Sequence, residues 1–243
     1  MRILGGRAGF NSVSFTGEKY ESISKLKDGK ITTEIRQKKE HMKITDILSK
    51  IPFIRVYAMF FEIIIEYWKL YLATVVALFL LEFFFNEKGN DSFLHNINMN
   101  TLVVVLSFLV IASLIIKATE MGRLHGAEHM VYHAYVKDPH LTLEKVKKQP
   151  RIHKDCGTNL VISIVICFFL LMMVFGNASW VFFISCSIGF ELWKTEPKIL
   201  WDAVLAIGKA AQYLLFTSKP EEKHLLVAME AMKKLEEAEY SNT

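Results

Sequence analysis

Residues 159–190 read NLVISIVICFFLLMMVFGNASWVFFISCSIGF and contain no charged side chain. Two further uncharged runs cover residues 101–116 and 70–81. Charge-free apolar segments are what the hydrocarbon core of a bilayer requires. The sequence therefore predicts a mainly α-helical integral membrane protein with about four transmembrane helices, at residues 70–85, 101–117, 159–175 and 178–193.

The composition supports the membrane assignment and excludes other classes. Hydrophobic residues make up 52% of the 243-residue chain, although 22% of the residues are charged. The N-terminus has no apolar segment of the kind that a cleavable signal peptide needs. The three cysteines do not form the pattern of a disulfide framework. The net charge of +4 comes from lysines that flank the apolar runs, and no basic patch interleaved with aromatics indicates nucleic acid as a partner.

The distribution of positive charge predicts the topology. Of the 29 Lys and Arg residues, 13 lie in residues 1–69, 8 in residues 117–158 and 7 after residue 193. Because Lys and Arg collect on the cytoplasmic side of bacterial and other membranes, both termini and the loop at 118–158 are expected in the cytoplasm.

The segments outside the apolar runs suggest smaller units. Residues 1–45 read as a small β-rich cytoplasmic unit, because Asp28-Gly29 is a hairpin signal between two strand-like runs. The glycines at 5 and 6 suggest a tight turn or a close backbone approach. Residues 46–69 suggest an amphipathic helix in the membrane interface, and a polar link follows the first span at 86–100. Amphipathic cytoplasmic helices are expected over 194–243, the last one opened by a capping box at Ser218 and Glu221.

The chemistry is concentrated in the loop at 118–158, within the four-span region 70–193. Residues 125–129 read HGAEH. On a helix, His125 and His129 lie one turn apart on one face, with side-chain origins roughly 5–6 Å apart, which suits two ligands of one metal ion. Glu128 flanks that face, where it can ligate or take a proton from a water. This is the inverted form of the zinc-protease H-E-x-x-H pattern. Solvated surface histidines, histidines that satisfy buried carbonyls and a purely structural metal site are the plain alternatives.

A second ligand pair follows in the segment that leads into the third span. His153 and Cys156 are three residues apart, and Gly157 would allow a close backbone approach. Two histidines from a helix and one more ligand from this segment give the three-ligand pattern of catalytic zinc. If both His153 and Cys156 bound, the site would be closed and more typical of a structural role. Cys156 as a buried thiol and His153 bonded to a lipid phosphate are the simpler alternatives.

Other candidates stay open on the sequence alone. His133 lies roughly 12 Å from His125 along a helix, too far to share one ion, and is placed next to the ligands or facing the substrate. Glu120 and Glu191 fall near the ends of predicted spans, where an acid is either functional or reaches the headgroups.

Several blocks in this order resemble one known family. They are the motif at 125–129, the segment RIHKDCGT at 151–158, and the segments SKP and LVAMEA at 218–220 and 226–231. The chain resembles the YqhQ-like bacterial membrane proteins, domain-of-unknown-function family 1385, commonly described as predicted metal-dependent enzymes. The resemblance covers nearly the whole chain and implies a multi-pass protein of the bacterial plasma membrane that holds a metal. The family usually has an acid-containing stretch where residues 11–15 stand, and its absence counts against a role for residues 5–16 in the site.

Two functional hypotheses follow. The first is a zinc hydrolase at the cytoplasmic membrane interface, with His125, His129 and either His153 or Cys156 as ligands and Glu128 as general base. Its substrate would be amphiphilic, either a lipid-like phosphate or ester or a membrane-proximal peptide. The second is a non-enzymatic membrane scaffold in which the metal is structural and the terminal segments bind partners.

Overall fold

The computed structural model describes residues 1–38, 43–85, 101–176 and 178–241. The chain divides into two compact units. Unit 1 comprises residues 1–40, 108–162 and 196–243, and unit 2 comprises residues 41–107 and 163–195. The loop at 118–158, which carries the histidine motif, belongs to unit 1.

Unit 1 begins with a four-stranded antiparallel sheet in the order β1-β2-β3-β4. Its strands are β1 (Gly5–Ala8), β2 (Ser12–Thr16), β3 (Tyr20–Lys27) and β4 (Lys30–Gln37). The predicted hairpin is confirmed: Asp28 and Gly29 both have positive φ, at 51° and 75°, as a two-residue turn requires. The small N-terminal β unit predicted from the sequence is therefore present.

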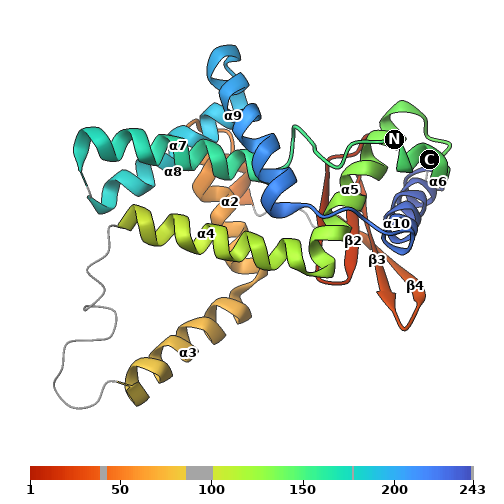
Figure 1. Cartoon of the computed structure of the whole chain (residues 1–243), viewed down its shortest axis with the longest axis horizontal. Coiled ribbons are helices and arrows are strands. Elements are labelled where there is room, and N and C mark those ends of the chain that lie inside the picture. The colour runs from red at the N-terminus through yellow and green to blue at the C-terminus, as the bar shows by residue number, and fades with distance from the viewer. Residues whose placement is uncertain (39–42, 86–100, 177, 242–243) are drawn as a thin grey trace. The chain divides into compact units, whose positions relative to one another are not determined.

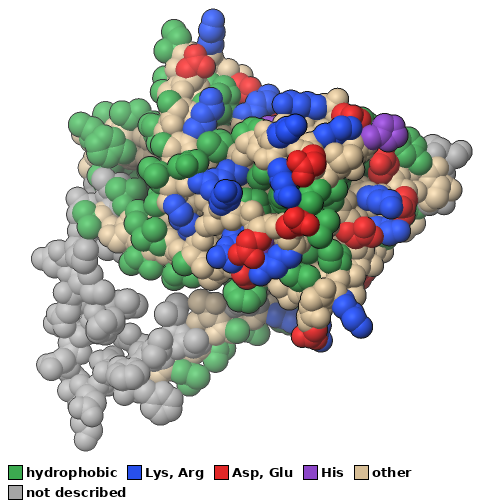
Figure 2. Space-filling view, turned by 45° about the vertical axis from the view of Figure 1, so that its right-hand side comes forward, with side chains coloured by type: hydrophobic (Ala, Val, Ile, Leu, Met, Phe, Trp, Pro, Cys, Tyr) green, Lys and Arg blue, Asp and Glu red, His purple; other side chains and the backbone are tan. Residues whose placement is uncertain are grey.

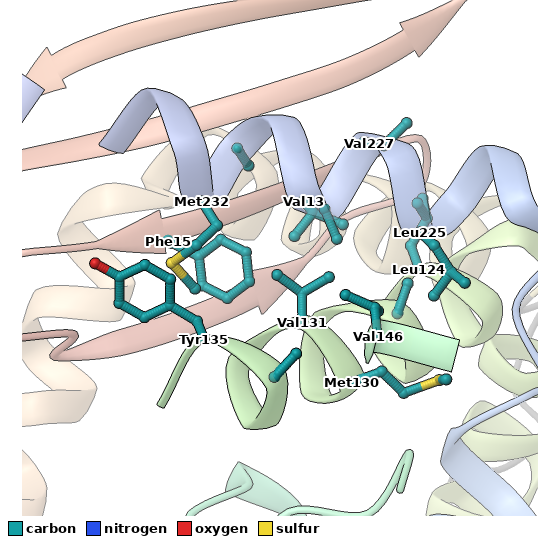
Figure 3. Close-up of a cluster of buried hydrophobic side chains, with 14 of the residues drawn as sticks. Val13, Phe15, Leu124, Met130, Val131, Tyr135, Val146, Leu225, Val227 and Met232 are labelled. Carbon is teal, nitrogen blue, oxygen red and sulfur yellow. The ribbon is translucent and has the colours of Figure 1, made fainter. Parts of the chain in front are cut away.

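Two helices cover one face of this sheet: α5 (Glu120–Lys137) and α10 (Glu222–Tyr240) (Figure 1). Fully buried side chains of β2, α5 and α10 meet in one apolar core, where Phe15, Val131 and Met232 point toward one another (Figure 3). At the far end of the sheet, the Glu239 carboxylate accepts hydrogen bonds from the backbone N–H groups of Lys19 and Tyr20 at 2.8 and 3.0 Å. These bonds tie α10 to the sheet, and the shared apolar core packs α5 against both.

The motif helix is separate from the helix that precedes it. α4 (Thr101–Ala118) ends before Thr119, whose ψ of 171° is extended. The helix that carries the histidine motif is therefore not a continuation of α4. After α5, the short helix α6 (Leu143–Lys147) is capped by Thr142 Oγ1, which accepts from the Lys145 N–H at 3.4 Å. The chain then returns through residues 148–156 to α7 (Gly157–Phe175).

Unit 2 is helical in its described part. It contains α1 (Lys43–Leu48), α2 (Arg55–Glu66), α3 (Trp68–Phe85), α8 (Ser179–Thr195) and parts of α4 and α7. Arg55 Nε donates to Glu191 Oε1 at 2.8 Å in a largely buried ion pair, and Tyr57 Oη donates to the Phe183 carbonyl at 2.7 Å. These contacts join α2 to α8. The single helix predicted over 46–69 is broken instead: Phe53 has a positive φ of 64° before α2, and α2 ends at Glu66 with Tyr67 as its C-cap.

The prediction of four transmembrane helices is wrong. Among the described residues, two helical segments are long and apolar enough to cross a membrane, Gly157–Phe175 and Lys198–Phe216. α8 has 17 residues and spans about 26 Å at 1.5 Å per residue, short of a hydrocarbon core of about 30 Å, and its last turns hold Glu191 and Lys194. The described apolar stretch of α4 over residues 106–118 is shorter than these two. Uncharged composition alone had suggested a span where the helix is too short.

The C-terminal region also differs from the prediction. The segment Lys198–Phe216, made of α9 (Lys198–Ala211) and the π-helical turn η1 (Gln212–Phe216), was expected to be an amphipathic cytoplasmic helix, yet it has a mean hydropathy of 1.4. The capping box is not at Ser218 and Glu221. Glu221 is itself the N-cap of α10 and shares the box with His224. The predicted link at 86–100 lies outside the described residues.

Apolar side chains also remain on the surface. Figure 2 shows hydrophobic side chains standing beside charged ones on one face of the molecule. The exposed apolar side chains of the two candidate spans include Met173, Val174 and Ile199, which are 69%, 73% and 86% exposed. Apolar exposure on this scale is typical of a surface that contacts lipid or another protein.

The core of unit 1 provides a stability test. Phe15 is fully buried, so Phe15→Ala should lower the free energy of unfolding by about 3–5 kcal/mol. Phe10, which is 68% exposed and lies just ahead of β2, is the matched control. Phe10→Ala should change the free energy of unfolding little. Chemical denaturation of the two purified variants makes the comparison. Equal losses would place the core elsewhere.

Candidate metal centre

The helix α5 presents the motif to a cavity of about 450 Å³ in unit 1. The rings of His125 and His129 lie on one face, with centroids 4.5 Å apart. The spacing predicted from the sequence is therefore realised as two neighbouring imidazoles. Leu124 and Val131, on the opposite side of the helix, are buried in the core. The core side of α5 thus determines which side faces the cavity.

The segment before α7 brings a thiol to these rings. Cys156 Sγ lies 3.4 Å from His125 Nε2. One ligand atom from each of His125, His129 and Cys156 can be chosen so that all lie within 4.8 Å of one another. Three of the four predicted ligands are therefore brought together, from two segments about thirty residues apart in the chain.

Backbone carbonyls set the orientation of both rings. His129 Nδ1 donates to the Arg151 carbonyl at 2.8 Å, and this leaves Nε2 with its lone pair. The ring of His125 also hydrogen-bonds the backbone of Phe216. In metal sites, a second hydrogen bond of this kind fixes the tautomer and the direction of a histidine ligand.

Burial keeps these rings neutral. It lowers the pKa of His125 and lowers the pKa of His129 well below its ordinary value of 6.5, and the neighbouring histidines add to the effect on His129. A metal binds the neutral imidazole, so the rings are in the required form at neutral pH. Burial raises the pKa of the Cys156 thiol, against the opposing effect of its hydrogen bond with Thr158. The thiol therefore keeps its proton until a cation favours the thiolate.

Glu128 lies beside the ligands but outside their group. Its Oε2 is 3.4 Å from His129 Nε2, the nitrogen left free by the bond to Arg151. Burial raises the pKa of Glu128 to about 8. The backbone of β1 passes next to its carboxylate: a Cβ added to Gly6 would lie 2.0 Å from Glu128 Oε1. A side chain at position 6 would displace the Glu128 carboxylate, and this explains Gly6, whereas a Cβ at Gly5 would meet no atom within 4 Å.

His153 is held nearby, yet it is not one of the three grouped ligands. Its ring centroid is 5.5 Å from that of His129 and 4.4 Å from that of Tyr132. The buried amide of Gln212 fixes its backbone, accepting from the His153 N–H at 2.9 Å and donating to its carbonyl at 3.0 Å. Burial lowers the pKa of His153 to about 4. His153 therefore lines the cavity as a neutral side chain.

The three residues left open by the sequence lie away from the ligand group. His133 Nε2 donates to the Ile152 carbonyl at 2.9 Å and helps to hold the returning segment. Glu120, the first residue of α5, pairs with Arg123 on the same helix and with His224 near the start of α10. Glu191 belongs to unit 2, where it pairs with Arg55.

Sequence reasoning missed two parts of the centre. Residues 5–16 were set aside, but β1 and the two residues before it line the cavity. Gln212, in the π-helical turn, was not noticed at all. A glutamine within an apolar helix was the available signal, although its partner lies 59 residues away and could not be identified from the sequence.

The buried carboxyl and imidazoles predict an unusual dependence of stability on pH in the metal-free protein. The pKa of Glu128 in the folded protein lies above its ordinary value of 4.5. The contribution of Glu128 to the free energy of unfolding is therefore full below pH 4.5 and is lost as the pH rises toward 8. The pKa values of His125 and His129 are lowered. The contribution of these histidines to the free energy of unfolding is therefore full above pH 6.5 and is lost as the pH falls below 6.5.

Between pH 6.5 and 8 the effect of Glu128 is therefore isolated, and the free energy of unfolding should fall by roughly 2 kcal/mol over this window. Glu128→Gln should abolish that fall, as measured by denaturation at a series of pH values. An identical slope in the variant would assign the effect to another group.

Comparison with known proteins gives a family but no activity. The profile of one family, described as "Protein of unknown function (DUF1385)", matches residues 11–238. The chain is similar to the "Uncharacterized protein YqhQ" of Bacillus subtilis (strain 168), with 25% identity over 146 residues, which is 55% of this chain and 46% of that protein. The match thus spans less than half the length of that relative. No solved structure matches. Because the profile covers nearly all of the sequence, the chain belongs to the DUF1385 family.

Proposed function

We propose that this protein is a metal-dependent hydrolase, with zinc as the metal, that acts at the surface of a membrane. The observation that carries the proposal is the grouping of His125, His129 and Cys156 within 4.8 Å, with the Glu128 carboxylate 3.4 Å from a ligand nitrogen. Three protein ligands leave a coordination position free, which is the arrangement of catalytic zinc.

The residues fit a zinc ion. Zinc accepts imidazole nitrogen and thiolate sulfur, and donors on a tetrahedral ion lie about 3.3–3.8 Å apart from the known bond lengths. The 3.4 Å from Cys156 Sγ to His125 Nε2 already meets that spacing. His129 needs only a small closure, and its tautomer is set by Arg151. Bound zinc would polarise a substrate carbonyl or phosphoryl oxygen and lower the pKa of water to about 7.

Glu128 is the general base in this proposal. Its carboxylate faces the ligand group from a buried position and can take a proton from the attacking water and pass it to the leaving group. The raised pKa belongs to the protein without a cation, and a nearby divalent charge would favour the ionised carboxylate. Tyr132 and His153, which also line the cavity, are placed to contact the substrate.

The position of the cavity supports a membrane-surface substrate. One candidate span begins at Gly157, directly after Cys156, and the other ends at Phe216, and both residues line the cavity. Only 28% of each span's apolar window is buried within the protein. Both spans would therefore meet the membrane surface at the metal centre. We place this surface on the cytoplasmic side of the bacterial plasma membrane, because of the surrounding lysines and arginines.

Metal content tests the ligand assignment. Protein purified in detergent should hold one zinc per chain, and His125→Ala, His129→Ala and Cys156→Ala should each remove most of it. His133→Ala is the matched control on the same helix and should keep its zinc, because His133 bonds a carbonyl instead. Elemental analysis makes the measurement. Retention of zinc by all three ligand variants would refute the site.

Turnover tests the base. Glu128→Gln should keep the zinc and lower kcat about 10²–10⁴-fold, since it cannot accept a proton. Zinc-loaded protein would be assayed on fluorogenic ester, phosphate and peptide substrates, with the variant in parallel. Bound zinc with equal, background-level turnover in both proteins would favour the scaffold hypothesis, in which the metal is structural.

A further inference from the structure

We infer that the substrate is an extended polypeptide segment that binds by pairing its backbone with the free edge of strand β1, beside the metal centre. This inference rests on the proposed hydrolase function and names its substrate class. It starts from the position of β1, which is an edge strand of the sheet and also lines the cavity that holds His125, His129 and Cys156.

The register of the sheet shows which backbone groups of β1 are unpaired. Gly9 N–H bonds to the Ser12 carbonyl at 2.8 Å, and Arg7 lies opposite Ser14 in the same register. Hydrogen-bonded and non-hydrogen-bonded residue pairs alternate along two antiparallel strands. Arg7 therefore exchanges backbone hydrogen bonds with β2, while the N–H and C=O groups of Gly6 and Ala8 point away from β2. An edge strand of this kind is a template for a further strand.

In the described part of the chain, the outer side of β1 is exposed at Gly5 and Gly6 and partly buried at Ala8. Within the described residues, no strand pairs with the outer side of β1. A row of backbone donors and acceptors recognises another extended backbone, in the manner of strand addition. A lipid tail offers no matching row, and therefore we favour a peptide over a lipid-like substrate.

The edge is also aligned with the chemistry. Gly6 faces Glu128, as its Cβ position 2.0 Å from Oε1 shows, and the ligand group lies beyond that carboxylate. A peptide paired along β1 would pass over the base and the metal. Glu128 takes a proton from water as its oxygen bonds to the peptide carbonyl carbon. The C–N bond then breaks, and the proton moves to the amide nitrogen. The products are a carboxylic acid and an amine, and the acid then gives its remaining proton to the amine or to water.

The test removes one outward N–H without disturbing the sheet. Ala8→Pro deletes a donor that points away from β2, and Pro is tolerated at such edge positions. The matched control is Ile35→Pro on β4, the opposite edge. The N–H of Ile35 also points away from the neighbouring strand. Lys38 N–H bonds to the Lys19 carbonyl, and because bonded and non-bonded pairs alternate along the strands, the pair of Ile35 and Ser22 is a non-bonded one. Both variants would be checked for zinc content and thermal stability.

The probe is an end-blocked, randomised decapeptide library carrying a fluorophore and a quencher, offered to the zinc-loaded full-length protein. Wild type and Ile35→Pro should cleave it, and Ala8→Pro should lose about tenfold or more in kcat/KM, because an edge hydrogen bond is missing. The same library with alternate backbone nitrogens methylated should resist cleavage by wild type, and this arm does not depend on the folding of any variant. Equal cleavage by Ala8→Pro, or cleavage of the methylated library, overturns the inference.

A binding measurement separates this inference from the proposed function. Amide hydrogen exchange over residues 3–9 of Glu128→Gln should slow when the library is added and should not slow with the methylated library. Slowed exchange with no cleavage by wild type would overturn the hydrolase and retain the peptide-binding edge. Unchanged exchange, together with turnover of ester or phosphate substrates, would overturn the peptide inference and leave the hydrolase standing.

Discussion

The hydrogen bond from His129 Nδ1 to the Arg151 carbonyl is the constraint on which the centre depends. It ties the motif helix to the returning segment, and it turns Nε2 of that ring toward the cavity. The apolar core fixes α5 from the other side, through Leu124 and Val131. Gln212 fixes the returning segment at His153, and Cys156 follows three residues later. The ligand group is therefore the meeting point of two rigid segments, which is what a preorganised metal site needs.

The same segments connect the centre to the two apolar helices. Cys156 immediately precedes Gly157–Phe175, while Gln212 and Phe216 belong to Lys198–Phe216. A shift of either helix relative to α5 would alter the hydrogen bonds of His125 or His153. Within unit 1, the candidate metal centre is thus joined to the first turns of α7 and to the end of the segment Lys198–Phe216. In the proposed function, this junction is where a substrate near the membrane reaches the cavity.

Local signals in the sequence predicted the parts that depend on neighbouring residues. Asp28-Gly29 predicted the hairpin and the HGAEH spacing predicted adjacent imidazoles. The glycine pair at 5 and 6 predicted a tight turn or a close approach, and the approach is present at Gly6 but not at Gly5. The span count failed, because uncharged composition does not reveal where a helix stops, and a segment with Asp202 and Lys209 was judged amphipathic. The choice between His153 and Cys156, the role of Gln212 and the position of β1 depend on contacts between distant segments. No periodicity encodes those contacts.

The most direct test of the account is zinc X-ray absorption spectroscopy on the purified full-length protein. The account predicts a first shell with imidazole nitrogens at about 2.0–2.1 Å and one sulfur at about 2.3 Å, and the residual zinc of Cys156→Ala should show no sulfur. A shell without sulfur, or protein that takes up no zinc, would contradict it.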